Sequence, residues 1–257
     1  MLELQNIRKI YNPGQITETC IFEDFSLTVN DGEFVSVVGS NGGGKTSLLN
    51  VICGSIPVEG GRILLDGKDI TSTPEYRRYR YIGRVYQNPA MGSCPHLTIA
   101  ENLALAENKG KPFGLSLGVR PGRQGRYKEL LAPLGLGLED KLSVPVGSLS
   151  GGQRQALSLL MATMTPIRFL ILDEHTAALD PKTAEVIMEL TDRVVKEKRL
   201  TAVMVTHNLR YAVEYGSRLL MMHKGGVVLD KSGAEKQAAK VSDLLGIFNS
   251  ISVECGN

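Results

Sequence analysis

The chain has 257 residues, of which 42% are hydrophobic and 22% charged, and its formal net charge at pH 7 is +2. This length and composition fit one large α/β domain, or one domain with a sizeable insertion, and allow a proper core. So small a net charge gives no electrostatic case for nucleic-acid binding. The four scattered cysteines form no C-x-x-C pair and predict reduced thiols. No apolar run approaches the ~20 residues of a membrane helix, and the polar N-terminus lacks the apolar core of a signal peptide.

The N-terminal part predicts short strands around a glycine-rich loop. The segments LELQNI and FSLTV alternate apolar and polar residues, as half-buried strands do. Asp31-Gly32, between FSLTV and EFVSVV, is a turn signal and predicts a hairpin. EFVSVV is rich in β-branched residues and is followed by the glycine-rich loop and the helical stretch KTSLLNVIC. Two further strand-like pieces flank Asp66-Gly67.

The middle of the chain predicts helices and a basic insertion. Thr98 and Glu101 fit the T-x-x-E pattern of a capping box, which opens a helix through ENLALAE. Residues 109–128 contain six Lys and Arg residues, several glycines and no acidic residue. This composition predicts an exposed, mobile insertion. QALSLLMAT, at 155–163, predicts an apolar helix.

The last third alternates strands and helices. RFLILD at 168–173 and LTAVMVT at 200–206 are typical of buried strands. Between them, Asp180 is a typical N-cap followed by Pro181 at the first helical position, and the predicted helix extends to about Lys198. This alternation predicts a mostly parallel sheet covered on both faces.

Residues 39–46 fit the pattern G-x-x-x-x-G-K-[ST], between a predicted strand and a predicted helix. Glycines let several backbone N–H groups point at one anion, and the helix N-terminus adds its positive dipole end. Lys45 offers a full charge to the β- and γ-phosphates, and Thr46 offers a hydroxyl ligand to Mg²⁺. The alternative is a glycine-rich turn that only resembles the motif. The strand–loop–helix context disfavours it, so the segment predicts nucleotide binding.

Two acids and a histidine follow predicted buried strands. Asp173 and Glu174 end the apolar stretch FLILDE; the first carboxylate can hold Mg²⁺ through water and the second can polarise an attacking water. His207 ends the strand VMVT and is interpreted as a γ-phosphate or water contact. The alternatives are an ordinary acidic surface turn and a structural histidine. The phosphate loop favours the catalytic interpretation, because open α/β sheets bind ligands at the carboxyl ends of parallel strands.

The stretch LSGGQ at 149–153 is the most informative in the chain. It places a serine hydroxyl and two glycines at the start of a helix, which predicts a second anion-binding N-terminus. With this stretch, the sequence resembles the ATP-binding subunits of ABC transporters, over nearly the whole chain and in the family's motif order. Ala177–Asp180 matches the family's D-loop, and Gln87 matches its Q-loop glutamine.

The resemblance implies a role for each motif residue. It assigns nucleotide contacts to Tyr11, which stacks on adenine, to the loop residues Gly39, Ser40, Asn41, Gly42, Gly43, Gly44, Lys45, Thr46 and Ser47, and to the signature residues Ser150, Gly151, Gly152 and Gln153. It assigns catalysis to Glu174, His207, Gln87 and Lys45, and Mg²⁺ ligation to Thr46, Gln87 and Asp173. The implied cofactors are ATP and Mg²⁺.

The resemblance also implies the fold. It predicts an α/β protein with a P-loop NTPase core, a mostly parallel sheet, an antiparallel β subdomain and a helical signature subdomain. Residues 1–257 would form a single ABC ATPase domain. Within it, 1–87 and 166–257 would form the RecA-like core with the β subdomain, and 88–165 the helical signature subdomain.

The implied partners are a second copy of the chain, a membrane-spanning permease and, for an importer, a solute-binding protein. Two copies would sandwich two ATP molecules, with Ser150 and Gly151 of one copy facing the γ-phosphate bound by Lys45 of the other. The expected location is cytoplasmic, peripheral on the cytoplasmic face of the cell membrane. The basic and aromatic segment 76–81 resembles an RNA-binding face, but a polar approach to the next strand is the favoured interpretation, and no nucleic-acid partner is expected.

The family pattern is not followed throughout. His175 stands where proline usually follows the glutamate, and Ala156 and Met161 stand where arginines often occur. None of these changes removes a group that touches nucleotide in the family. The pattern resembles uptake systems for amino acids or similar small solutes, so import is expected. The alternatives are an exporter subunit, a soluble ABC ATPase outside transport and a regulatory module that binds ATP without hydrolysis.

Overall fold

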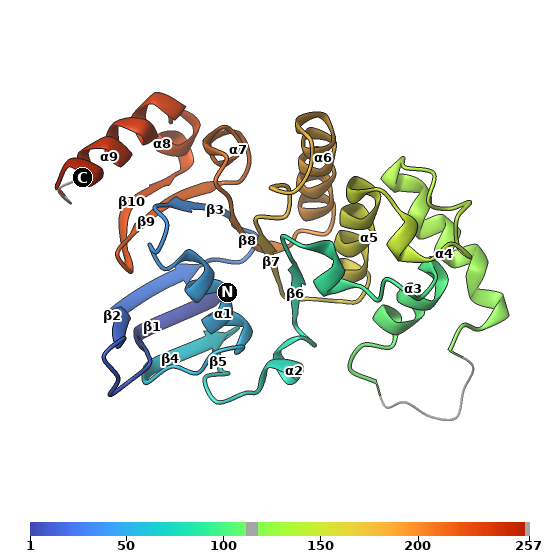
Figure 1. The fold of residues 1–257 in the computed structure, drawn as a ribbon, viewed down its shortest axis with the longest axis horizontal. Helices are drawn as coiled ribbons and strands as arrows, with labels where there is room; N and C mark the ends of the chain where they lie inside the picture. Colours follow the sequence, from blue (N-terminus) through green and yellow to red (C-terminus); the bar gives the residue numbers. More distant parts are fainter. Residues whose placement is uncertain (112–117, 255–257) are drawn as a thin grey trace. The chain divides into compact units, whose positions relative to one another are not determined.

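The computed structural model describes residues 1–111 and 118–254, with the side chains of residue 121 and of 251–254 left out. The chain forms two compact units (Figure 1). Unit 1 joins Met1–Arg78 to Arg199–Asn257, and unit 2 is Tyr79–Lys198. The subdomain boundaries expected from the sequence, 87/88 and 165/166, fall inside unit 2, and that division stays a prediction.

Unit 1 contains an antiparallel sheet with the strand order β2-β1-β4-β5. Its strands are β1 (Leu2–Tyr11), β2 (Thr19–Val29), β4 (Gly60–Leu65) and β5 (Lys68–Asp69). The short β4–β5 hairpin turns at Asp66-Gly67, as the sequence predicts. β1 and β2 are longer than expected, because Leu2 to Tyr11 pair along nearly their whole length with β2.

The hairpin predicted at Asp31-Gly32 is wrong. A turn is present, with the Glu33 N–H donating to Asn30 O at 3.1 Å, but it passes the chain from one sheet to another. β3 (Phe34–Gly39) pairs in parallel with β8 (Thr201–Val205) and β9 (Arg218–His223), not with β2. All six β3 residues are buried, whereas β2 buries alternate residues. A strand buried on both faces suits a parallel sheet.

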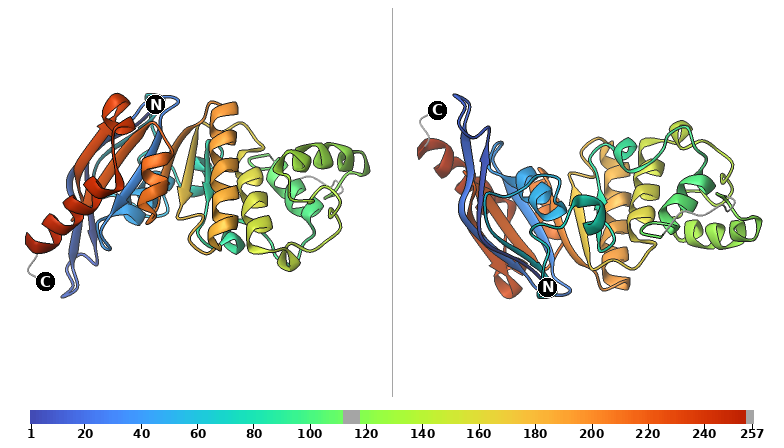
Figure 2. Two further views of the ribbon diagram at one scale, coloured as in Figure 1. Left: turned by 90° about the horizontal axis from the view of Figure 1, so that it is seen from above. Right: turned by 90° about the horizontal axis from the view of Figure 1, so that it is seen from below.

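The second strand set of unit 1 has the order β10-β9-β3-β8, with β10 (Gly226–Ser232) antiparallel to β9. The helices of this unit are α1 (Lys45–Cys53), α2 (Glu75–Arg78), α7 (Leu209–Glu214), α8 (Gly233–Gln237) and α9 (Val241–Glu254). Figures 1 and 2 show α7, α8 and α9 gathered against β3, β9 and β10. A cluster of fully buried or nearly buried apolar residues fills this layer: Val38, Ala212, Leu219, Met221, Ala239 and Leu244.

The basic and aromatic segment 76–81 includes a buried cation. Arg78 is only 4% exposed. Its guanidinium donates to Val51 O at 2.9 Å and Ile52 O at 3.0 Å, two carbonyls of the last turn of α1. A cation at a helix C-terminus satisfies carbonyls that have no partner within the helix. Arg78 therefore closes the helix that follows the phosphate loop.

Unit 2 combines a parallel strand pair with helices. β6 (Ile82–Val85) pairs with β7 (Phe169–Asp173), in the register Arg84↔Ile171. Its helices are α3 (Ile99–Glu107), α4 (Gln124–Leu131), α5 (Gly151–Thr163) and α6 (Pro181–Glu197). The predicted caps are confirmed: Thr98 forms a capping box with Glu101, and Asp180 accepts the Thr183 N–H at the start of α6. The long helices α5 and α6 pack side by side (Figure 2).

The exposed insertion predicted over 109–128 is wrong in its C-terminal part. Tyr127 in α4 is 1% exposed and donates to Glu107 Oε2 at 3.0 Å. Arg123 and Arg126 both pair with Glu107 Oε1, at 2.7 and 3.0 Å. The segment has no acidic residue of its own, but Glu107 at the end of α3 pairs with its arginines. The buried Tyr127 ring packs this part of the segment into the core. Residues 112–117, also covered by this prediction, lie outside the described residues.

Candidate nucleotide-binding site

The phosphate loop closes on its own lysine. Residues 39–46 connect the end of β3 to the first turn of α1. Lys45 is 6% exposed, and its Nζ donates to Gly39 O and Ser40 O, both at 2.8 Å. The Gly43 N–H donates to Ser40 O at 3.1 Å and keeps the loop compact. The ammonium group is therefore fixed against the backbone at the start of the loop.

Two positions of the loop require glycine. A Cβ on Gly39 would lie 2.0 Å from the backbone oxygen of Met222, which pairs with it in β9. Gly44 has φ +97, and a Cβ there would lie 3.0 Å from the Phe22 ring. Side chains at either position would push the loop away from its supports. The pattern of glycines thus follows from how closely neighbouring strands approach the loop.

The turn between β9 and β10 braces the loop. His223 Nδ1 lies 3.0 Å from Ser40 Oγ, and the Gly225 N–H donates to Gly43 O at 3.2 Å. Gly225 in turn packs directly on the Ile21 carbonyl of β2. Sequence reasoning missed His223, because 183 residues separate it from Ser40 and no motif marks it.

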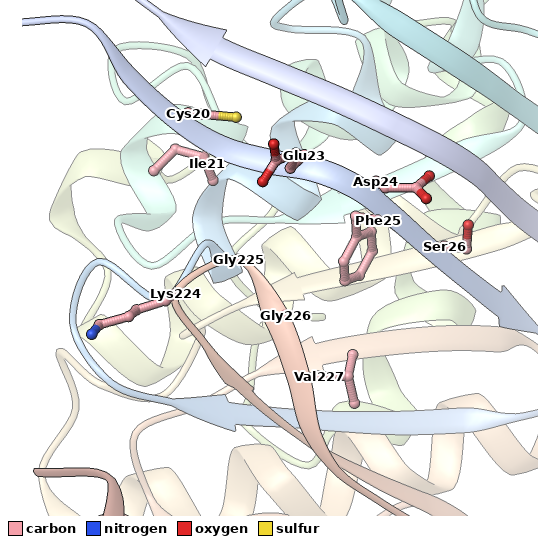
Figure 3. Close-up of a pocket in the computed structure, with 10 residues that line it drawn as sticks. All are labelled: Cys20, Ile21, Glu23, Asp24, Phe25, Ser26, Lys224, Gly225, Gly226 and Val227. Carbon is pink, nitrogen blue, oxygen red and sulfur yellow. The ribbon is translucent and has the colours of Figure 1, made fainter. Parts of the chain in front are cut away.

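The same turn lines a hollow of about 480 Å³. Figure 3 shows this hollow between the β2 residues 20–26 and the turn residues 224–227. Glu23, Asp24 and Lys224 give it both charge signs. None of the predicted site residues lines it, so the hollow is distinct from the phosphate loop.

Tyr11 and His207 lie in the same unit as the loop. The Tyr11 hydroxyl is 3.1 Å from Ser47 Oγ, which ties the predicted adenine-stacking residue to the first turn of α1. His207 is exposed and follows β8, whose Val205 pairs with Val37 of β3. Because β3 and β8 are parallel, both strands end at one edge of the sheet. The exposed His207 and the phosphate loop therefore follow neighbouring strand ends.

The predicted catalytic carboxylates lie in unit 2, at the end of β7. Asp173 Oδ2 accepts from Arg84 Nη2 at 2.7 Å, and the two side chains are 13% and 7% exposed. Glu174 has a backbone φ of +46, in the left-handed region that residues other than glycine rarely adopt. Such strained positions cluster at functional sites. The left-handed backbone of Glu174 turns the chain directly after the end of β7.

Gln87 is exposed and lies two residues after the end of β6. The residue before it, Tyr86, accepts a hydrogen bond from a buried side-chain amide. Gln155 of α5 is 1% exposed, and its Nε2 donates to Tyr86 O at 3.1 Å. Sequence reasoning missed both Gln155 and Arg84. Arg84 does leave a signal, since it is the one charged residue in the strand IGRV.

The signature opens α5 as predicted. Ser150 is exposed and caps the helix: its Oγ accepts the Gln153 N–H at 3.3 Å, and Gln153 Oε1 accepts the Ser150 N–H at 3.2 Å. A Cβ on Gly152 would lie 2.3 Å from Thr183 Cγ2 of α6. The glycine thus lets α5 pack closely against α6, while the serine hydroxyl stays at the surface.

His175 ties the end of β7 to α6. Thr191 Oγ1 donates its single hydrogen to Ile187 O at 2.7 Å, so His175 Nε2, at 3.0 Å, must carry the proton and donate to Thr191. Burial lowers the pKa of His175 to about 4, so the ring is neutral. His175 directly follows Glu174 and stands where the family usually has proline. Its neutral ring attaches this part of the chain to α6.

The described structure thus presents the predicted site as two sets. The phosphate loop, Tyr11 and His207 belong to unit 1, and Gln87, the signature, Asp173 and Glu174 belong to unit 2. The proposed Mg²⁺ donors are a hydroxyl, an amide oxygen and a carboxylate, the hard oxygen ligands that Mg²⁺ prefers. Across residues 1–111 and 118–254, no group of three or more His, Cys, Asp and Glu side chains could hold a metal ion.

Comparison with known proteins decides the family. The family model described as "ABC transporter" matches residues 22–177. The chain belongs to the ABC transporter family. The "Tyrosine transport ATP-binding protein" of Clostridioides difficile (strain R20291) is 47% identical over 248 residues, which are 96% of this chain and 98% of that protein. A "Spermidine/putrescine import ATP-binding protein" of Haemophilus influenzae is 33% identical over 91% of this chain, which spans 59% of that protein.

Solved structures agree. A dimeric ATP-binding cassette in a post-hydrolysis state with ADP and Pi matches with a TM-score of 0.76 and 29% identity, over 90% of this chain and 98% of that one. The ADP conformation of another ABC transporter cassette matches with a TM-score of 0.79 and 25% identity, over 100% of this chain and 99% of that one. The α/β ABC ATPase fold expected from the sequence is confirmed. The chain is the ATP-binding and ATP-hydrolysing subunit of an ABC transporter.

In the described part of the chain, every helix is too short or too polar to cross a bilayer.

We expect Glu174→Gln to lower the rate of ATP hydrolysis by about 10²-fold or more, because an amide cannot act as a general base. ATP binding should persist, since the phosphate loop is untouched. Phosphate release and nucleotide affinity, measured on the same sample, check this. Glu189→Gln changes an exposed acid of α6 and is the matched control. Retention of most of the hydrolysis rate in Glu174→Gln would refute its role as general base.

We expect the stability of the folded chain to depend on His175 between pH 7 and 5. The folded pKa is about 4 and the ordinary value 6.5, so the unfolded chain binds more protons in this window. The stabilisation is present above pH 6.5 and falls as the pH drops towards 4. The loss from pH 7 to pH 5 should be about 2 kcal/mol greater in the natural chain than in His175→Gln. Denaturant unfolding at each pH measures it; parallel curves for the two proteins would contradict the buried neutral ring.

Proposed function

We propose that this chain energises the import of tyrosine or a chemically similar amino acid, as one of two copies docked to a permease on the cytoplasmic face of the membrane. The observation that carries the solute class is the 47% identity to the tyrosine transport ATP-binding protein, which extends over 98% of that protein. Import is supported by relatives that are named import ATP-binding proteins for polyamines and methionine. A solute-binding protein on the far side of the membrane completes the proposed system.

In the proposed mechanism, unit 1 binds the nucleotide. The backbone N–H groups of residues 39–46 and the ammonium of Lys45 hold the β- and γ-phosphates. Tyr11 stacks on the adenine. His207 contacts the γ-phosphate or the attacking water. The support for these roles is the buried Lys45 fixed against the loop backbone and the exposed His207 beyond the adjacent strand.

Unit 2 supplies the hydrolytic groups. Glu174 takes the proton of the attacking water, and Gln87 orients that water. Gln87 and Asp173 of this unit, with Thr46 of unit 1, are the residues that would hold Mg²⁺, and the ion would supply positive charge to the transferred phosphoryl group. Ser150 and the N-terminus of α5 contact the γ-phosphate bound by the other copy. Hydrolysis therefore needs two copies, and release of phosphate lets them separate and move the permease.

The solute assignment is tested in the native organism. We expect Lys45→Ala, introduced into the chromosomal gene, to lower uptake of radiolabelled tyrosine at least about tenfold, because loss of a preorganised charge-stabilising group commonly costs 10²–10³ in rate. Uptake of lysine should be unchanged. Lys196→Ala is the matched control, since Lys196 is 74% exposed and pairs with Asp192 one helical turn away.

Undiminished tyrosine uptake in Lys45→Ala cells would contradict the solute assignment. A pull-down of the tagged chain from detergent-solubilised membranes separates the remaining cases. If a multi-span membrane protein co-purifies but tyrosine uptake is unchanged in the variant, the chain still serves a transporter, and the transported solute is not tyrosine. Only soluble partners, with ATPase activity intact, would overturn the proposed permease.

A further inference from the structure

Arg84 forms an ion pair with Asp173, the carboxylate that we propose as a Mg²⁺ ligand. Arg84 Nη2 and Asp173 Oδ2 are 2.7 Å apart, and both side chains are largely removed from water. The two residues come from paired strands of one unit, since Arg84 is in register with Ile171, two residues before Asp173. The contact is therefore fixed by the sheet.

The guanidinium is held from a second side as well. Its Cζ lies 4.6 Å from the centre of the Tyr86 ring. The Tyr86 hydroxyl lies 2.8 Å from that of Tyr79, and Gln155 binds the Tyr86 carbonyl. A stacked guanidinium with a fixed aromatic partner loses little further freedom when it pairs with a carboxylate. Arg84 is thus preorganised to face Asp173.

The charge balance at Asp173 follows from this geometry. An arginine side chain stays protonated at every physiological pH. The carboxylate is therefore neutralised within its own unit, without any metal ion. A divalent cation that approaches Asp173 meets a fixed positive charge within a few ångströms, in surroundings where water screens charges poorly.

We propose that Arg84 acts as a resident counter-cation that keeps Asp173 from binding a free divalent metal ion. The metal then binds well only together with the phosphates of the nucleotide, which supply additional negative oxygen ligands. Arg84 is a positioning and charge-balancing residue in this scheme, and it makes metal binding conditional on nucleotide. The inference rests on the proposed role of Asp173 as a Mg²⁺ ligand.

The test measures Mn²⁺ binding to the full chain without nucleotide, by electron paramagnetic resonance. We expect Arg84→Met to bind Mn²⁺ about tenfold more tightly than the natural chain, because a full positive charge next to the carboxylate is removed. Arg84→Gln should show the same gain, and its amide can still donate to Asp173, which keeps the test valid if Arg84→Met does not fold. Adding Asp173→Asn to Arg84→Gln should abolish the gain.

Arg126→Met is the matched control. It removes the same charge from another ion pair of unit 2, with Glu107, and should leave Mn²⁺ affinity unchanged. Unchanged affinity in Arg84→Gln, an equal gain in Arg126→Met, or a gain that survives Asp173→Asn would each overturn the proposal. Failure of the underlying role of Asp173 would appear separately, as undiminished Mn²⁺ binding by Asp173→Asn in the presence of ATP.

Discussion

The close approach of the β9 backbone to the phosphate loop is the constraint on which the rest of the site depends. The Met222 carbonyl leaves no room for a side chain at Gly39, and the Phe22 ring leaves little at Gly44. With these two glycines the loop can fold back, so that Lys45 reaches the carbonyls of Gly39 and Ser40. A loop held in this form needs little reorganisation when phosphate binds, which lowers the entropic cost of recognition.

The proposed catalytic carboxylates of unit 2 depend on a different kind of constraint. Asp173 is the last residue of β7, whose other four residues are buried, and the chain then turns at Glu174, which has a left-handed backbone. Two contacts keep this turn in place: Arg84 neutralises the first carboxylate, and neutral His175 donates to Thr191 in α6. The His175–Thr191 contact is buried and the Arg84–Asp173 pair is largely removed from water, so replacing one partner of either contact leaves a polar group poorly satisfied. Arg84 of β6 and Thr191 of α6 thus support the end of β7 from two sides.

The sequence predicted the motifs and their local structure well, because each depends on residues close together in the chain. The phosphate loop, the Thr98 and Asp180 caps and the strand before Asp173 are of this kind. The sequence-based predictions failed where a segment's structure depends on residues far away in the chain. The β2–β3 hairpin was wrong because pairing is decided by β8 and β9, and the exposed basic insertion was wrong because Glu107 lies outside it. His223 and Gln155 gave no local signal at all.

We propose that the loop around Lys45 binds ATP and that a second copy of the chain then contacts the bound nucleotide. Light scattering on the Glu174→Gln chain, with and without ATP and Mg²⁺, tests this most directly. We expect the monomer mass of 27.9 kDa without nucleotide and twice that mass with ATP. Lys45→Ala, added to the same chain, should abolish the change. A mass that stays at the monomer value with saturating ATP would show that ATP does not bring two copies together.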